Sequence, residues 1–133
     1  MKRWLLVLII IPLFFLPIPS SPDHTGIYNT WSGLIWCSHE MACIHEVGHK
    51  LDDLAGWVSK SPEYQEAVTA LGYEYFTENN PHGRDISFSN HTEAYAEIFT
   101  LSFGQEQNMH PSLRQFYDWD RASQLLEKYA NEK

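Results

Sequence analysis

Apolar and polar positions alternate with a helical period between Ser38, which is suited to be an N-cap, and Gly56, which is suited to end a helix. One side of this predicted helix is an apolar stripe formed by Ile44, Val47, Leu51 and Leu54. The roughly opposite side carries Met41, His45, His49 and Asp52. Burial in a core explains the stripe but not the two histidines, so the second side is the candidate for chemistry.

Start and stop signals predict three further helices. The first runs from Ser61-Pro62 to Leu71 and ends at Gly72, the second runs from a capping-box-like Asn90 to about Phe103 and ends at Gly104, and the third covers about Trp119 to Tyr129. Strand-forming residues at Trp31–Trp36, and a shorter stretch at about 86–88, predict strands. We therefore expect a helix-rich α+β fold. Five aromatic residues are expected in its core: Trp31, Trp36, Trp57, Phe99 and Phe103.

The first 20 residues differ from the rest of the chain. Lys2 and Arg3 precede an apolar run from Trp4 to Leu16, which is the layout of an export signal. The prolines in and after this run disfavour a stable spanning helix, but an uncleaved anchor at residues 4–19 stays an alternative. We therefore expect residues 21–133 to be one domain that is secreted or extracytoplasmic, with membrane contact only through the N-terminal segment.

Charge narrows the range of partners. The chain has 17 acidic residues against nine lysines and arginines, and Lys2 and Arg3 belong to the predicted signal. Nucleic acid and anionic membrane surfaces are therefore not expected as partners. Cys37 and Cys43 are the only cysteines, and in an exported chain they could form a disulfide; zinc ligation is the alternative for them.

The sequence His45-Glu46-Val47-Gly48-His49 carries the clearest chemical signal. Two histidines four residues apart on a helix can reach one metal ion, and the intervening glutamate can act on a water beside it. A catalytic zinc needs a third protein ligand. The helix that begins near Asn90 offers Glu93 and Glu97, which share a face, so that one can bind the metal while the other orients a ligand.

These two segments resemble the gluzincin clan of metallopeptidases, which pairs HExxH on one helix with a glutamate ligand on a later one. Residues 45–56 and 93–99 resemble more narrowly the catalytic domain of anthrax lethal factor-like peptidases. The resemblance implies a small zincin-like domain with a short sheet packed on two ligand-bearing helices. It implies one Zn²⁺ ion held by His45, His49 and Glu93, with Glu46 as general base. Three residues would be acceptors around the ligands: Glu97, Asp52 and Asp53.

One position departs from that pattern. Lethal factor-like peptidases have a tyrosine seven residues before the ligand glutamate, where it can hydrogen-bond the oxyanion, and this chain has Ile86 there. Four other residues are candidate oxyanion donors: Tyr73, Tyr75, His82 and His91.

The expected function is that of a monomeric zinc metalloendopeptidase acting on a peptide or protein substrate, which an edge of the small sheet could align beside the metal. Two alternatives are a catalytically weak or inactive zinc-stabilised protein-binding module, and a secreted effector that binds a protein through an aromatic surface.

Overall fold

The computed structural model describes residues 26–78 and 90–130. Within these ranges the fold is mostly helical with one two-stranded antiparallel sheet, which confirms the expected helix-rich α+β class. The elements follow the order β1 Gly26–Tyr28, β2 Ile35–Cys37, α1 Glu40–Leu54, η2 Val58–Lys60, α2 Pro62–Glu78, α3 His91–Leu101, η3 Glu106–Asn108, α4 Pro111–Arg114 and α5 Trp119–Ala130. The predicted signal or anchor at residues 1–20 and the predicted strand at 86–88 lie outside the described residues.

The sheet is a short hairpin. Gly26, Ile27 and Tyr28 pair with Cys37, Trp36 and Ile35, respectively. The strand predicted at Trp31–Trp36 was placed too early, because residues 29–33 form the turn and only Ile35–Cys37 pairs. Asn29 specifies this turn, since its side-chain oxygen accepts the backbone N–H groups of Trp31 and Ser32.

α1 begins one residue later than predicted. Nδ1 of His39, rather than the side chain of Ser38, caps the helix by accepting the N–H of Ala42. The helix ends at Leu54 with Ala55 as its C-cap, followed by Gly56 at φ +77°. The left-handed conformation of Gly56 explains why the helix stops where its sequence predicts.

α2 continues further than predicted. Its first part is interrupted at Gly72, where φ is +76° and ψ is 161°, and a second helical segment then continues to Glu78. The glycine therefore breaks the helix without ending helical structure. α3 begins as predicted, because the side chain of Asn90 accepts the N–H of Glu93. It ends at Leu101, two residues earlier than expected, and Phe103 and Gly104 follow with positive φ.

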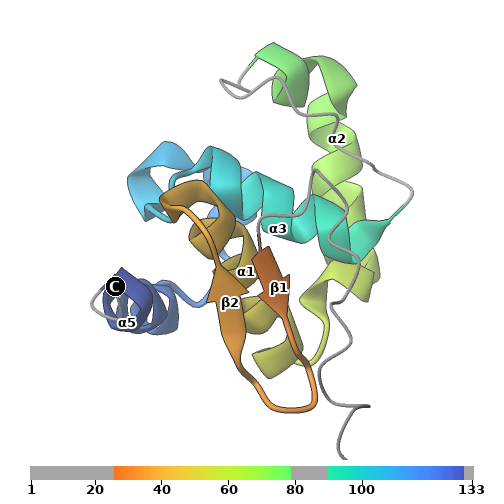
Figure 1. The fold of residues 1–133 in the computed structure, drawn as a ribbon. Helices are drawn as coiled ribbons and strands as arrows, with labels where there is room; N and C mark the ends of the chain where they lie inside the picture. The colour runs from red at the N-terminus through yellow and green to blue at the C-terminus, as the bar shows by residue number, and fades with distance from the viewer. Residues whose placement is uncertain (1–25, 79–89, 131–133) are drawn as a thin grey trace, which may run out of the picture.

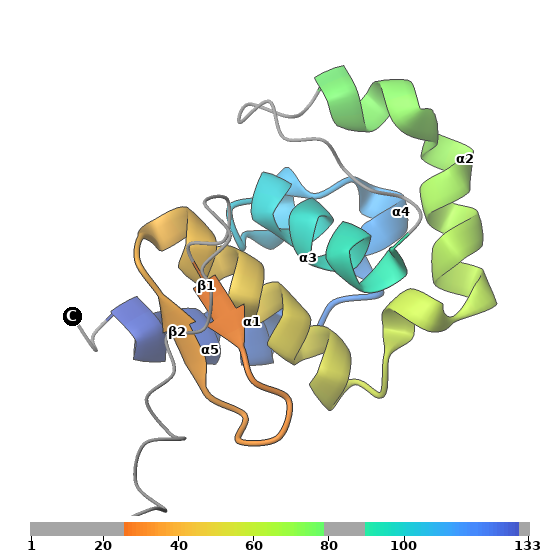
Figure 2. The same ribbon diagram turned by 45° about the vertical axis from the view of Figure 1, so that its right-hand side comes forward.

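α1 is the centre of the fold. The hairpin, α3 and α5 all contact α1, as Figures 1 and 2 show, and η2 at its end leads into α2. The core between these elements is continuous and contains Val47, Leu51, Tyr64, Tyr95 and Phe99, none of which is more than 2% exposed. The side of α1 that was predicted to be an apolar stripe therefore forms part of the core, although Leu54 at its end is exposed.

The expectation of five aromatic core residues was partly wrong. Phe99 is fully buried, whereas Trp31, Trp36 and Phe103 are exposed, Trp31 completely. Trp31 lies in the hairpin turn, and Trp36 alternates along β2 with Cys37, which is bonded to α1, so that Trp36 belongs to the opposite face of the strand. Within the described residues no helix combines the length and the apolar character needed to cross a membrane.

Candidate metal centre

His45 and His49 face each other on one side of α1. Their ring centroids are 4.7 Å apart, and the Nε2 atoms of the two rings are separated by 3.1 Å. This approach follows from the helical spacing of four residues, which stacks the two side chains one turn apart. Two imidazole nitrogens thus point to the same small volume.

Glu93 of α3 supplies the third group. Its Oε1 lies 3.1 Å from Nε2 of His49, and its Oε2 lies 3.3 Å from Nε2 of His45. One ligand atom from each of the three residues lies within 4.8 Å of the other two. Two imidazole nitrogens and one carboxylate at this spacing could hold a single metal ion, as the sequence predicts for His45, His49 and Glu93.

Gly48 allows α3 to approach so closely. A Cβ atom at this position would stand 2.9 Å from Cα of Ala96 and 3.3 Å from its carbonyl oxygen. These are backbone atoms of α3, so a larger residue at position 48 would force the two helices apart. The glycine inside the HExxH segment, and a small residue opposite it, therefore bring the ligand-bearing faces of α1 and α3 together.

Glu97 lies behind His45, one turn after Glu93. Its Oε1 is 3.0 Å from Nδ1 of His45, on the ring edge opposite the site. A proton on Nδ1 that points to this carboxylate leaves Nε2 with a lone pair for a metal ion. Glu93 thus faces the Nε2 atoms of both histidines, and Glu97 faces Nδ1 of His45.

The carboxylates of Glu93 and Glu97 also change the pKa of His45, and the histidines change the pKa of Glu93. Burial lowers the pKa of His45, but hydrogen bonds to Glu93 and Glu97 outweigh it and raise that pKa from 6.5 to about 9. Hydrogen bonds from His45 and His49 hold the pKa of Glu93 well below its ordinary value. In the metal-free protein the cluster therefore retains a proton on His45 at neutral pH, while Glu93 is ionised.

Glu46 is buried beside the histidines, with 7% of its surface exposed. Burial raises its pKa, and the nearby His45 and His49 act in the opposite direction. The backbone N–H of Tyr28 in β1 donates a hydrogen bond to this carboxylate. A carboxylate in this environment is a stronger base than an exposed one, which suits the predicted role of Glu46 in accepting a proton.

Asp52 and Asp53 have hydrogen bonds that involve neither imidazole. Oδ1 of Asp52, which is fully buried, accepts the N–H of Ser59 and so fixes the start of the segment that leads to α2. Oδ2 of Asp53 accepts the hydroxyl of Tyr28 at 2.6 Å. Their contacts organise η2 and the hairpin.

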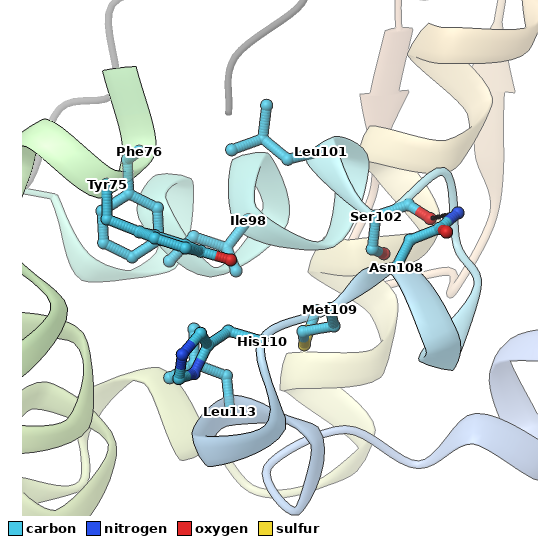
Figure 3. Close-up of a pocket in the computed structure, with 9 residues that line it drawn as sticks. All are labelled: Tyr75, Phe76, Ile98, Leu101, Ser102, Asn108, Met109, His110 and Leu113. Carbon is cyan, nitrogen blue, oxygen red and sulfur yellow. Dashed lines mark hydrogen bonds between the residues drawn. The ribbon is translucent and has the colours of Figure 1, made fainter. Parts of the chain in front are cut away.

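The candidate oxyanion donors are spread over the molecule. Tyr73 is exposed on the second segment of α2, and His91 is exposed at the first position of α3. Tyr75 lines a separate cavity of about 90 Å³, shown in Figure 3, where its ring lies 5.2 Å from that of His110. No candidate metal ligand lines this cavity. His82 lies outside the described residues.

The sequence pattern does not predict the contact between the hairpin and the site. Tyr28 and Gly26 touch Glu46, but neither residue has a sequence feature that indicates a role in the site. Cys37 and Cys43 form a disulfide that joins β2 to α1, which decides between the two alternatives for these cysteines.

No protein-family model, curated protein or solved structure matches this chain significantly.

Proposed function

We propose that this protein is a zinc-dependent peptidase whose metal is held by His45, His49 and Glu93. The observation that carries the proposal is the convergence of two Nε2 atoms of α1 and the carboxylate of α3, with ligand atoms within 4.8 Å of one another. A set of two nitrogens and one oxygen is typical of catalytic zinc and leaves a coordination position for water. The position of the Glu97 carboxylate, 3.0 Å from Nδ1 of His45, supports the same assignment.

Zinc bound there would supply Lewis-acid chemistry, making water more acidic and a carbonyl group more electrophilic. Residues of the chain carry out the proton transfers. The carboxylate of Glu46 accepts the proton of the attacking water and then passes it to the leaving amine, which releases the two product peptides. Glu97 keeps the proton of His45 on Nδ1, away from the metal-facing nitrogen.

A peptidase assay tests this proposal with a matched pair of proteins. The wild-type chain and Glu46→Gln are loaded with zinc, and cleavage of a diverse peptide library is followed by mass spectrometry. Both proteins should bind one zinc ion, and Glu46→Gln should cleave at least about a hundredfold more slowly because the proton acceptor is gone. Cleavage by Glu46→Gln at the wild-type rate, or cleavage indifferent to phenanthroline, would rule out the proposed mechanism.

A binding module that keeps zinc without turnover is the second candidate. Four exposed apolar side chains on the hairpin favour it: Ile27, Trp31, Leu34 and Trp36. Surface aromatic groups of this kind are common in protein interfaces. Stoichiometric zinc with no cleavage in the same assay would select this function.

A further inference from the structure

Gly26, the first residue of β1, lies against the side chain of Glu46. Gly26 pairs with Cys37 across the two strands, and Cys37 is bonded to Cys43 of α1. Cys43 precedes Glu46 by three residues and therefore lies on the same side of the helix, one turn away. We call this linked pair, Gly26 with Cys37, the disulfide rung.

Gly26 fits closely against the Glu46 side chain. A Cβ atom at position 26 would stand 2.8 Å from Cγ of Glu46 and 3.0 Å from its Oε1. Two residues further along β1, the N–H of Tyr28 donates to the same carboxylate. The strand therefore restricts Glu46 both by contact and by a directed hydrogen bond.

The hairpin contributes none of the three candidate metal ligands, which come from α1 and α3. The far end of the hairpin has its own attachments to α1, since Tyr28 bonds Asp53 and Lys50 donates to the carbonyl of Gly33. Next to the contact between Gly26 and Glu46, the disulfide joins β2 to α1 by a covalent bond. Loosening it should affect the general base while leaving the metal ligands in place.

We propose that the disulfide rung positions Glu46 for proton transfer. The turnover rate then depends on the Cys37–Cys43 disulfide, whereas the zinc content of the protein does not. The proposal rests on the proposed peptidase function. Gly26, Tyr28 and the disulfide act through Glu46 and are positioning residues. A thiol-reducing environment would therefore lower the activity of a protein that still holds its metal.

The contact itself is tested by a double-mutant cycle that needs no activity. Gly26→Ala should lower the melting temperature in the wild-type background, because the new methyl group meets Glu46. In the Glu46→Ala background the same change should cost much less. Ile27→Ala is the control, since Ile27 is 41% exposed and its effect should be equal in both backgrounds. Equal effects of Gly26→Ala in both backgrounds would overturn the proposal.

The consequence for turnover is tested by reducing the zinc-loaded protein with a water-soluble phosphine. The S–S bond breaks, two thiols form, and the phosphine becomes its oxide with an oxygen atom taken from water. We expect unchanged zinc content, a kcat lower by about tenfold or more with little change in KM, and faster exchange of the Tyr28 amide hydrogen. The Cys37→Ser/Cys43→Ser variant should show the low kcat with or without phosphine.

An unchanged kcat together with unchanged exchange at Tyr28 after reduction would overturn the positioning role. Absence of peptidase activity in both redox states would instead overturn the proposed function. The melting cycle and the exchange at Tyr28 then decide whether the rung holds Glu46, so the two failures are distinguishable.

Discussion

The imidazole of His45 lies between two carboxylates that act on its two nitrogens. Glu93 approaches Nε2 at 3.3 Å and Glu97 approaches Nδ1 at 3.0 Å. In the metal-free protein both contacts favour the protonated ring, which is why its pKa rises to about 9 despite burial. A metal ion at Nε2 must displace that proton, so proton and metal compete at a single atom.

This competition predicts how metal affinity depends on pH. Below about pH 9 His45 is mainly protonated, so each unit of rising pH should strengthen zinc binding about tenfold, and the gain should level off as pH passes the pKa of His45. Glu93 adds no further dependence near neutrality, because its pKa is lowered and it is already ionised. Competition with a chelating dye between pH 6.5 and 8.5, corrected for protonation of the dye, measures the slope.

Glu97→Gln is the matched control for this measurement. It removes one of the two carboxylates that raise the pKa of His45, so the affinity should level off at a lower pH than in the wild type. A zinc affinity that does not change over this pH range would contradict the prediction.

At the residue scale, sequence spacing was sufficient for the candidate ligands and insufficient for their surroundings. The spacing of four fixes the relative positions of His45 and His49 on any helix, and a glutamate pair with the same spacing predicts Glu93 and Glu97. The bond from Tyr28 to Glu46 uses a backbone N–H, which every residue except proline has. The identity of the side chain at position 28 therefore gives no indication of this hydrogen bond.

At the scale of elements, the site depends on how closely α1 and α3 pack. Gly48→Ala would put a methyl group 2.9 Å from Cα of Ala96. Alanine is a better helix former by about 1 kcal/mol, but separating the two backbones should cost more, for a net loss on the order of 1–3 kcal/mol. Urea unfolding measures this loss, and zinc affinity should fall as well.

Glu66→Ala, on an exposed part of α2, is the control for Gly48→Ala and should change neither quantity appreciably. A Gly48→Ala protein that is more stable than the wild type and binds zinc equally would show that α1 and α3 do not meet at this point.

The N-cap of α3 gives a second prediction at this scale. Asn90→Ala removes the acceptor for the N–H of Glu93 and should destabilise the protein by about 1 kcal/mol. Asn90→Asp keeps an acceptor and should be close to neutral. Thermal unfolding of both variants checks this expectation, and equal losses for alanine and aspartate would refute the capping role.

Elements with clear terminal signals were predicted well and the hairpin was not. Asn90 and Gly56 act locally, so their effects can be read from a few neighbouring residues. The strand composition of residues 31–36 was misleading because Asn29 and Gly33 turn the chain there. Whether the Trp36 side chain is buried depends on which elements pack against β2, and the residues near Trp36 in the sequence do not determine this.

At the scale of the whole molecule, the candidate metal site lies between α1 and α3, two helices that are separated along the chain by α2. A ligand that binds only the folded state stabilises it by about 4 kcal/mol when its concentration is a thousand times its Kd. Stripping zinc with a chelator should therefore lower the melting temperature by about 10 °C or more. Scanning calorimetry with and without the chelator measures the difference.

His49→Ala is the control for metal removal. It lacks one ligand, so its melting temperature should not respond to the chelator. A wild-type protein whose melting temperature is the same in zinc and in chelator would show that the cluster holds no ion under these conditions.

The contact between Gly48 and Ala96 also gives a criterion for finding distant relatives. A chain that builds the same site needs glycine before its second motif histidine and a small residue between its two glutamates, whatever the rest of its sequence has become. Among such chains, the residues at these two positions should each vary far less than their neighbours on the same helices. Adding them to the HExxH pattern would separate homologues from the many chance occurrences of that short string.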